Sequence, residues 1–141
     1  MILLDYKDNR PIYEQVAEKL QELMLLGVLE EDSQMPSVRS LAMELSINPN
    51  TIQRAYGELE RNGFIYTIKG RGSFVGSVNK LRTARQQEVA RKMEELAREA
   101  KKIGISKEEF LKTASEVYDH DLSGKENQDG SGKNDRPDSK V

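Results

Sequence analysis

The sequence of 141 residues contains no cysteine and no tryptophan. Without cysteine the chain can form no disulfide, bind no metal through a thiolate and use no thiol nucleophile, and this composition suits the reducing cytoplasm. It also lacks any apolar run near the roughly 18 residues that a membrane-spanning helix requires, and its N-terminus lacks the basic and then apolar pattern of a signal peptide. We therefore expect a cytoplasmic chain with no membrane partner.

Little in the sequence supports catalysis. The single histidine, His120, stands at the edge of a polar tail, and neighbouring acids such as Glu94 and Glu95 point in different directions on a helix. Gly70 and Gly72 precede no predicted helix, so they fit a hairpin turn better than a phosphate-binding loop. We expect no catalytic residue, no metal site and no cofactor.

Basic residues are slightly outnumbered by acidic ones overall, 22 against 24, and they are unevenly distributed. The formal net charge is -2 and the isoelectric point about 5.6, values that by themselves argue against a nucleic-acid partner. Residues 1–32 hold three basic against eight acidic residues, whereas residues 33–79 hold five basic against three acidic ones. The local excess fits a nucleic-acid-binding face, although charge alone decides nothing.

Three helices are predicted in the first half of the chain. Apolar residues recur every three or four positions from Pro11 to Leu26, and Gly27 suits the residue after a helix end. Ser37 can cap a short helix over residues 38–45, and a third apolar pattern covers residues 49–61. Because only two residues separate the end of the second helix from the cap of the third, the pair is a helix-turn-helix candidate.

Pro49 marks the start of the third helix and not a break in one. A proline inside a helix costs about 3 kcal/mol, whereas the first helical position tolerates it. Asn48 is then the N-cap, whose side-chain oxygen can accept a hydrogen bond from the N–H of Asn50 or Thr51.

After Gly63 the pattern changes to that of β-strands. Residues 64–68 and 73–75 are rich in aromatic and β-branched side chains, and Lys69–Gly72 between them is a turn-forming run with two glycines. A hairpin with a basic tip that directly follows a helix-turn-helix makes a winged helix.

The second half of the chain is first charged and helical, then polar. An apolar stripe predicts a helix over residues 81–103 that ends at Gly104, and a capping box over residues 106–109 opens another helix. From His120 onward almost no residue is apolar, so we expect disorder. The predicted parts are a winged helix-turn-helix domain over residues 1–78, a helical dimerisation region over 79–119 and a disordered tail over 120–141.

The exposed face of the third helix is polar and free of acids at its start. Asn50, Gln53 and Arg54 are the base-reading candidates, because Asn and Gln can bond adenine and Arg can bond guanine in the major groove. Thr51 suits a phosphate or a thymine methyl, and the helix dipole adds a modest attraction for phosphate. The alternative is that these are the ordinary polar and capping residues of any surface helix.

Three further basic residues lie on the same expected surface. Arg39, near the start of the second helix, can bind phosphate or pair with Glu44 in solvent. Lys69 and Arg71 at the hairpin tip can reach the DNA backbone or the minor groove, or simply protect the edge of the hairpin. Their joint placement favours DNA binding over the separate alternatives.

These motifs resemble the DNA-binding domain of GntR-family transcription regulators. The resemblance covers residues 11–75 and rests on MPSVRSLA (Met35–Ala42), NPNTIQRAYGELE (Asn48–Glu60) and KGRGSFV (Lys69–Val75). The short helical C-terminal part looks like the YtrA subfamily, in which two helices mediate dimerisation. The residues that fall on the family's DNA-contact positions are Arg39, Asn50, Thr51, Gln53, Lys69, Gly70 and Arg71.

Two positions depart from the family pattern. Many members carry Arg where this chain has Pro49, so a contact made there elsewhere is lost here and base preference does not transfer. Many also carry Gly where Ser46 stands in the turn, and a left-handed backbone at that residue would impose a steric cost on Ser.

The sequence thus predicts an α+β fold, with a winged helix-turn-helix domain followed by a short α-helical dimerisation region. The predicted function is that of a homodimeric repressor on an inverted-repeat operator of double-stranded DNA; by the resemblance it controls neighbouring ABC-transporter genes. The alternative is a winged-helix protein-interaction module that binds no DNA, and the existence of a small-molecule effector is left open. The predicted DNA-binding residues are Arg39, Asn48, Asn50, Thr51, Gln53, Arg54, Lys69, Gly70 and Arg71. The predicted dimerisation residues are Val89, Met93, Leu96, Ala100, Ile103 and Phe110.

Overall fold

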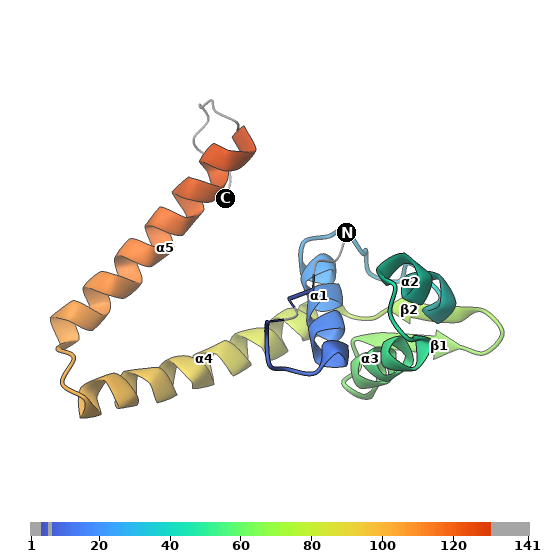
Figure 1. Ribbon diagram of the computed structural model, residues 1–141, viewed down its shortest axis with the longest axis horizontal. Coiled ribbons are helices and arrows are strands. Elements are labelled where there is room, and N and C mark those ends of the chain that lie inside the picture. Colours follow the sequence, from blue (N-terminus) through green and yellow to red (C-terminus); the bar gives the residue numbers. More distant parts are fainter. Residues whose placement is uncertain (1–3, 6, 131–141) are drawn as a thin grey trace. The chain divides into compact units, whose positions relative to one another are not determined.

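The computed structural model describes residues 4–5 and 7–130, with side chains up to His120. The chain divides into two compact units, one up to Glu88 and one from Val89 onward. Figure 1 shows the order of the elements along the chain. They are α1 (Ile12–Leu25), α2 (Val38–Leu45), α3 (Pro49–Arg61), β1 (Ile65–Ile68), β2 (Gly72–Val75), α4 (Val78–Lys102) and α5 (Lys107–Gly130).

One hydrophobic core holds the first unit together. The apolar stripes of α1, α2 and α3 all face it, as their helical spacing predicts, and α3 packs against both other helices. Both strands and the first turn of α4 complete it, through Ile65, Val75 and Leu81. The largest fully buried side chains are Leu20, Met24, Ile52, Leu59, Ile65, Leu81, Val16 and Val75.

Both helices of the helix-turn-helix begin at the predicted caps. The Ser37 hydroxyl accepts from the Ser40 N–H at 3.0 Å, and the Asn48 side-chain oxygen accepts from the Asn50 N–H at 2.7 Å. Pro49 occupies the first position of α3, so the interpretation of this proline as a helix start is confirmed. Pro11 is the N-cap of α1, so this helix begins one residue after the start of its apolar pattern.

The turn between α2 and α3 contains a strained residue. Ser46 has φ 56° and ψ 46°, the left-handed conformation that a glycine adopts more easily. Its N–H bonds back to the Met43 carbonyl at 3.3 Å, and the N–H of Ile47 bonds to the Ala42 carbonyl at 3.0 Å. These bonds satisfy carbonyls at the end of α2, so the conformation closes the helix while straining Ser46.

The wing is an antiparallel hairpin whose register pairs Ile65 with Val75 and Ile68 with Gly72. The α1–α2 connection adds a short third segment to it, because Gln34 forms a β-bridge with Phe74. The Met35 N–H also donates to the Ser73 carbonyl at 2.7 Å. This segment, which no local sequence pattern predicts, attaches the wing to the residues just before α2.

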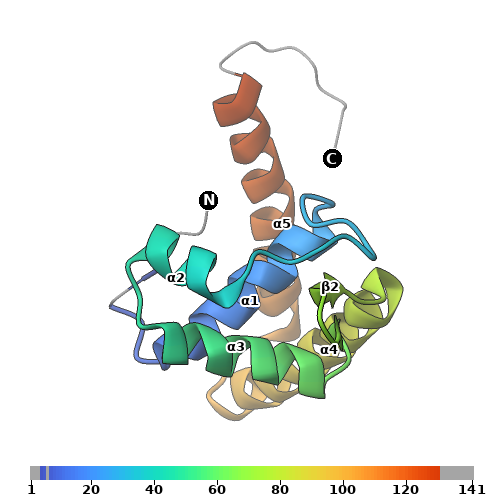
Figure 2. The same cartoon turned by 90° about the vertical axis from the view of Figure 1, so that its right-hand side faces the viewer.

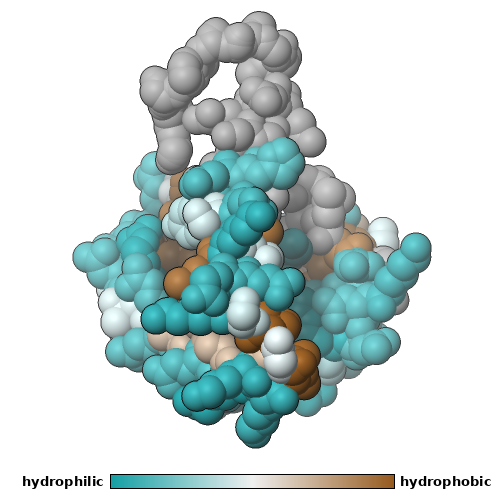
Figure 3. Space-filling view, turned by 90° about the vertical axis from the view of Figure 1, so that its left-hand side faces the viewer, coloured by the Kyte–Doolittle hydropathy of each residue, from teal (hydrophilic) through white to brown (hydrophobic). Residues whose placement is uncertain are grey.

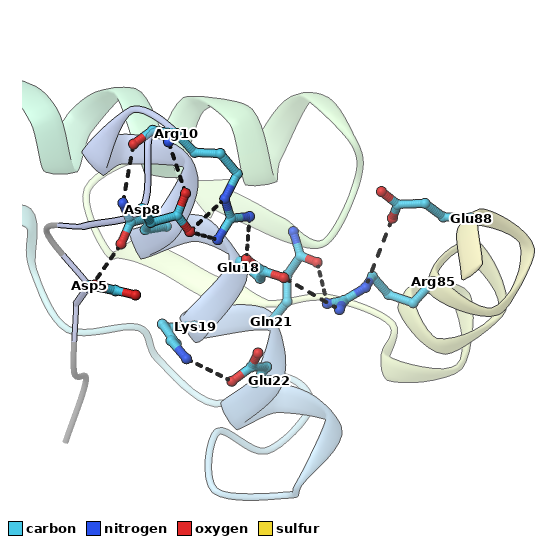
Figure 4. Close-up of polar contacts among 10 residues, drawn as sticks. Asp5, Asp8, Arg10, Glu18, Lys19, Gln21, Glu22, Arg85 and Glu88 are labelled. Atoms are coloured by element: carbon cyan, nitrogen blue, oxygen red, sulfur yellow. Dashed lines mark hydrogen bonds and ion pairs between the residues drawn. The ribbon is translucent and has the colours of Figure 1, made fainter. Parts of the chain in front are cut away.

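The first part of α4 belongs with the first unit, which we call the winged unit because it contains the helix-turn-helix and the wing. Leu81 is buried in its core, and the Arg85 guanidinium donates to the Gln21 side chain of α1 at 2.9 Å (Figure 4). Glu18 of α1 also pairs with Arg85, at 3.9 Å. The boundary between the two compact units accordingly falls after Glu88.

The second unit consists of the rest of α4 and of α5. Gly104, with φ 91°, separates the two helices, and the Ser106 hydroxyl caps α5 by accepting from the Glu109 N–H at 3.1 Å. Helix α5 continues to Gly130, past the predicted start of the tail at His120, since extending a formed helix costs far less than nucleating one. The rest of the predicted tail, residues 131–141, lies outside the described residues.

Apolar side chains of the second unit reach its surface. Figure 3 shows hydrophobic side chains among hydrophilic ones on the side where α4 meets α5. Those with more than half of their surface exposed are Met93, Leu96, Ile103, Leu111, Val117 and Tyr118. In the part of the chain that the structure describes, no helix combines the length and the apolar character needed to cross a membrane.

Candidate nucleic-acid interface

The outer face of α3 presents polar side chains at its amino end. Asn50, Gln53 and Arg54 are exposed and Thr51 is half-buried, whereas the opposite face lies in the core. The first turn contains no acidic residue. This end of the helix therefore combines hydrogen-bonding side chains with the positive end of the helix dipole, as a contact with DNA requires.

The carboxyl half of α3 has a different charge pattern. Glu58 forms an ion pair with Arg61 one turn later, and Glu60 is exposed beside them. An acidic surface repels phosphate, so the amino half of α3 is the part suited to a duplex.

Asn48 already has a structural task. Its side-chain oxygen caps α3 by accepting from Asn50, although the residue is exposed. The amide N–H₂ group is the end of this side chain that is left to donate to a phosphate or a base. The predicted contact by Asn48 is thus limited to a donor role.

Arg54 lies against α1. Its guanidinium carbon is 4.1 Å from the centre of the Tyr13 ring. This is a cation–π contact between the first turn of α1 and α3, the second helix of the helix-turn-helix, which we call the recognition helix. Tyr13 is half-buried and packs against the hydrophobic core. This pair was not predicted, because the two residues are far apart in sequence and no local pattern links them.

Arg39 is exposed on the first turn of α2. The ion pair with Glu44 that was its alternative role is not among those formed by the described residues. Its side chain therefore extends into solvent from the helix that precedes α3, where a phosphate contact remains its predicted role.

The tip of the wing is basic and exposed, and a hydrogen bond from the α1–α2 connection holds its backbone. Lys69, Gly70 and Arg71 are all exposed, and Gly70 has φ 82°, which suits the tight turn. The Arg71 N–H closes that turn on the Ile68 carbonyl at 2.8 Å. The Gln34 amide donates to the Arg71 carbonyl at 2.7 Å, so the α1–α2 connection fixes the backbone of the tip.

Two aromatic rings stiffen the hairpin behind its tip. Tyr66 and Phe74 stack with their ring centres 5.7 Å apart. The Tyr66 hydroxyl donates to the Asp32 carboxylate at 2.9 Å, and this hydrogen bond raises the pKa of Tyr66 above its ordinary value. A stiff hairpin presents its tip in one orientation, which lowers the entropy cost of binding.

The recognition helix and the wing tip share one side of the winged unit. Figure 1 shows the tip of the β1–β2 hairpin projecting away from α1, and Figure 2 looks at the unit from that side. In Figure 2, α3 lies across the front with α1 behind it. A duplex that meets this side can touch both α3 and the tip, the geometry on which the DNA-binding interpretation depends.

Among residues 4–5 and 7–120, whose side chains the structure describes, no three His, Asp or Glu side chains come together as metal ligands would.

Comparison with known proteins identifies relatives of both units. The family model described as "Bacterial regulatory proteins, gntR family" matches residues 12–75. The "HTH-type transcriptional repressor YtrA" of Bacillus subtilis (strain 168) is 34% identical over 129 residues, which are 90% of this chain and 99% of that protein.

Solved structures that resemble this one include two regulators of the same family. A "GntR family transcriptional regulator from Listeria monocytogenes" is 33% identical with a TM-score of 0.69, over 81% of this chain and 99% of that chain. "YtrA from Sulfolobus acidocaldarius, a GntR-family transcription factor" is 35% identical with a TM-score of 0.51, over 63% of this chain and 97% of that chain. The likeness thus extends past the winged unit into the C-terminal helices.

Proposed function

Because the chain belongs to the GntR family of bacterial regulatory proteins, we propose that it is a YtrA-like repressor that binds a specific operator through its winged helix-turn-helix. The observation that carries this proposal is the shared side of α3 and the basic wing tip (Figure 2). The named relatives are transcription regulators, which supports a regulatory and non-enzymatic role in the cytoplasm.

The recognition helix reads the operator in this proposal. Asn50 and Gln53 lie exposed on the amino half of α3, and their amides can each form two hydrogen bonds to the major-groove edge of adenine. Thr51 is half-buried beside them, and its shorter side chain contacts a phosphate or a thymine methyl. Base selectivity therefore resides in the first two turns of α3.

The phosphate backbone supplies much of the affinity. Arg39 lies exposed on α2, and Lys69 and Arg71 lie exposed at the wing tip. Phosphate contacts of this kind fix the orientation of the domain without reading sequence. Each neutralised phosphate releases counterions, so binding weakens as salt increases.

The second unit joins two copies of the chain. Val89, Met93, Leu96 and Ile103 expose between 48% and 69% of their surfaces, an apolar stripe that a second copy would cover. Ala100 is buried and Phe110 is half-buried, so these two offer less surface to a second copy than the other four residues do. A two-fold dimer holds two recognition helices about 34 Å apart or more, which calls for an inverted-repeat operator.

The decisive experiment begins with selection of bound sequences from a random pool of duplex DNA. The selected duplex and a scrambled duplex are then compared by gel shift at about 50 and about 200 mM salt. We expect an enriched inverted repeat, tighter binding to it than to the scrambled duplex, and weaker binding to both at the higher salt.

Two results would contradict the proposal. No enrichment, with salt-insensitive or absent binding, favours a winged-helix module that binds proteins, a reading supported by the acidic residues 1–32. Enrichment of a single half-site would retain DNA binding and reject the dimeric operator. Control of ABC-transporter genes is tested separately, by whether the enriched repeat occurs upstream of such genes.

A further inference from the structure

The contact between Tyr13 and Arg54 assigns a role in DNA binding to a residue outside the helix-turn-helix. We propose that Tyr13 is a positioning residue that holds the Arg54 guanidinium on the flank of α3, where it binds a DNA phosphate and not a base. This inference rests on the proposed function, and it changes the base-reading role that the sequence pattern predicts for Arg54.

The geometry holds the guanidinium while leaving it able to donate. The Arg54 guanidinium carbon is 4.1 Å from the Tyr13 ring centre, well inside the roughly 6 Å limit of cation–π contacts. An arginine stacked on a ring keeps its N–H groups in its own plane, directed outward. Arg54 is exposed, so those donors face solvent, whereas the ring beneath is half-buried and fixed by the core.

The position of the Arg54 side chain against Tyr13 favours a contact with a DNA phosphate over one with a base. Residues 50, 53 and 54 all lie on the outward face of α3 at the helical repeat, but the Arg54 side chain lies over the Tyr13 ring of α1. Base edges form the floor of the major groove, which is about 8.5 Å deep, and the sugar-phosphate backbone forms its walls. A guanidinium drawn toward the neighbouring helix faces the wall, where its fork fits two phosphate oxygens.

Tyr13 also offers a matched control. Its hydroxyl donates to the Glu14 carboxylate at 3.4 Å, whereas the Arg54 guanidinium lies over the ring. Tyr13→Phe therefore removes the hydroxyl and keeps the stack, whereas Tyr13→Leu keeps an apolar side chain and removes the stack.

The experiment measures binding of the full chain to its selected operator and to random duplex, for wild type, both Tyr13 variants, Arg54→Ala and Tyr13→Leu/Arg54→Ala. We expect Tyr13→Phe to bind as wild type and Tyr13→Leu to bind both duplexes about two- to fivefold more weakly. Arg54→Ala should lose about tenfold or more on both duplexes and reduce the salt slope by about 1. Adding Tyr13→Leu to Arg54→Ala should cause no further loss.

Equal binding by the Leu and Phe variants would overturn the positioning role of Tyr13. A loss by Arg54→Ala on the operator alone would overturn the phosphate assignment. Thermal unfolding checks each variant, and Tyr13→Met replaces Tyr13→Leu if the latter does not fold. Wild-type chain that binds neither duplex refutes the proposed function instead, so the two failures are distinguishable.

Discussion

Ser46 is, with Asp32, one of two non-glycine residues that have a positive φ in the part of the chain that the structure describes. A left-handed conformation costs a residue with a Cβ atom about 1 to 2 kcal/mol, and glycine avoids that cost while losing more entropy on folding. We expect Ser46→Gly to raise the free energy of unfolding by about 0.5 to 1 kcal/mol in urea denaturation. Ser40→Gly is the control, because Ser40 is helical and its replacement should destabilise by a similar amount. A loss of stability in Ser46→Gly would show that the serine is not strained.

Gly76 is required for a close approach between backbone segments. A Cβ atom there would lie 2.9 Å from the Gly63 carbonyl oxygen and 3.0 Å from that of Phe64, and neither atom belongs to a flexible side chain. We expect Gly76→Ala to lower the free energy of unfolding by about 1 to 3 kcal/mol.

Gly57 is the matched control for Gly76. A Cβ atom at Gly57 would meet nothing within 4 Å, and the residue lies inside α3. Gly57→Ala should therefore stabilise the chain by up to about 1 kcal/mol. Thermal unfolding of the two variants should give shifts of opposite sign, and equal shifts would contradict the close approach at Gly76.

At the scale of the element, α3 and the wing should contribute differently to binding. Gln53→Ala should weaken operator binding by about 1 to 3 kcal/mol and leave binding to random duplex unchanged, because it removes a base contact. Lys69→Ala should weaken binding to both duplexes and lower the salt slope by about 1. Gel shifts with the operator and with random duplex test these two roles. If Gln53→Ala lost the same affinity for both duplexes, Gln53 would be a phosphate contact.

Tyr56 links α3 to the segment before α2, and this link should depend on pH. Its hydroxyl donates to the Pro36 carbonyl at 2.7 Å, and burial raises the pKa of Tyr56 from 10.0 to about 12. Between these values the unfolded chain releases a proton that the folded chain keeps, so the stability present below pH 10 is lost as pH rises toward 12.

Denaturant unfolding at about pH 8 and about pH 11 tests this link. The free energy of unfolding should fall more between the two values in wild type than in Tyr56→Phe, which has no hydroxyl to titrate. At the lower pH the variant should be less stable by about 1 kcal/mol, since it loses the hydrogen bond to Pro36. An equal fall in both proteins would mean that Tyr56 does not carry this pH dependence.

The helices were predictable from sequence because their signals are local. The apolar period of α1 to α3 and the caps at Ser37 and Asn48 each lie within a few residues of the structure that they specify. The turn of the wing was equally evident from its glycines. The bridge from Gln34 and the stack on Tyr13 were not, since each joins residues dozens of positions apart and depends on how the core brings the elements together.

At the scale of the whole molecule, the exposed stripe on the second unit should control assembly. We expect wild-type chain to sediment at micromolar concentration as a dimer of 16.0 kDa subunits. Met93→Glu with Leu96→Glu should sediment as a monomer, because each places a charge on an apolar surface. Glu95→Gln, which changes a neighbouring exposed position without adding charge, should remain dimeric.

The same variants should separate assembly from DNA contact. The monomeric variant should lose about tenfold or more in affinity for an inverted repeat, where two linked domains bind together, and little for a single half-site. Wild-type chain that sediments only as a monomer would remove the dimer from the proposal.

The pairing of the α1–α2 connection with β2 has a consequence for how such a regulator can change. Gln34 and Met35 fix the wing to the framework, so replacing the side chains at its tip alters charge there without shifting the reading helix. Under the proposed function, mutations at the tip would raise or lower the occupancy of all genomic targets by a similar factor. Mutations at the start of α3 would instead change which targets are bound most tightly. Overall affinity and target preference can therefore diverge independently among descendants of this chain.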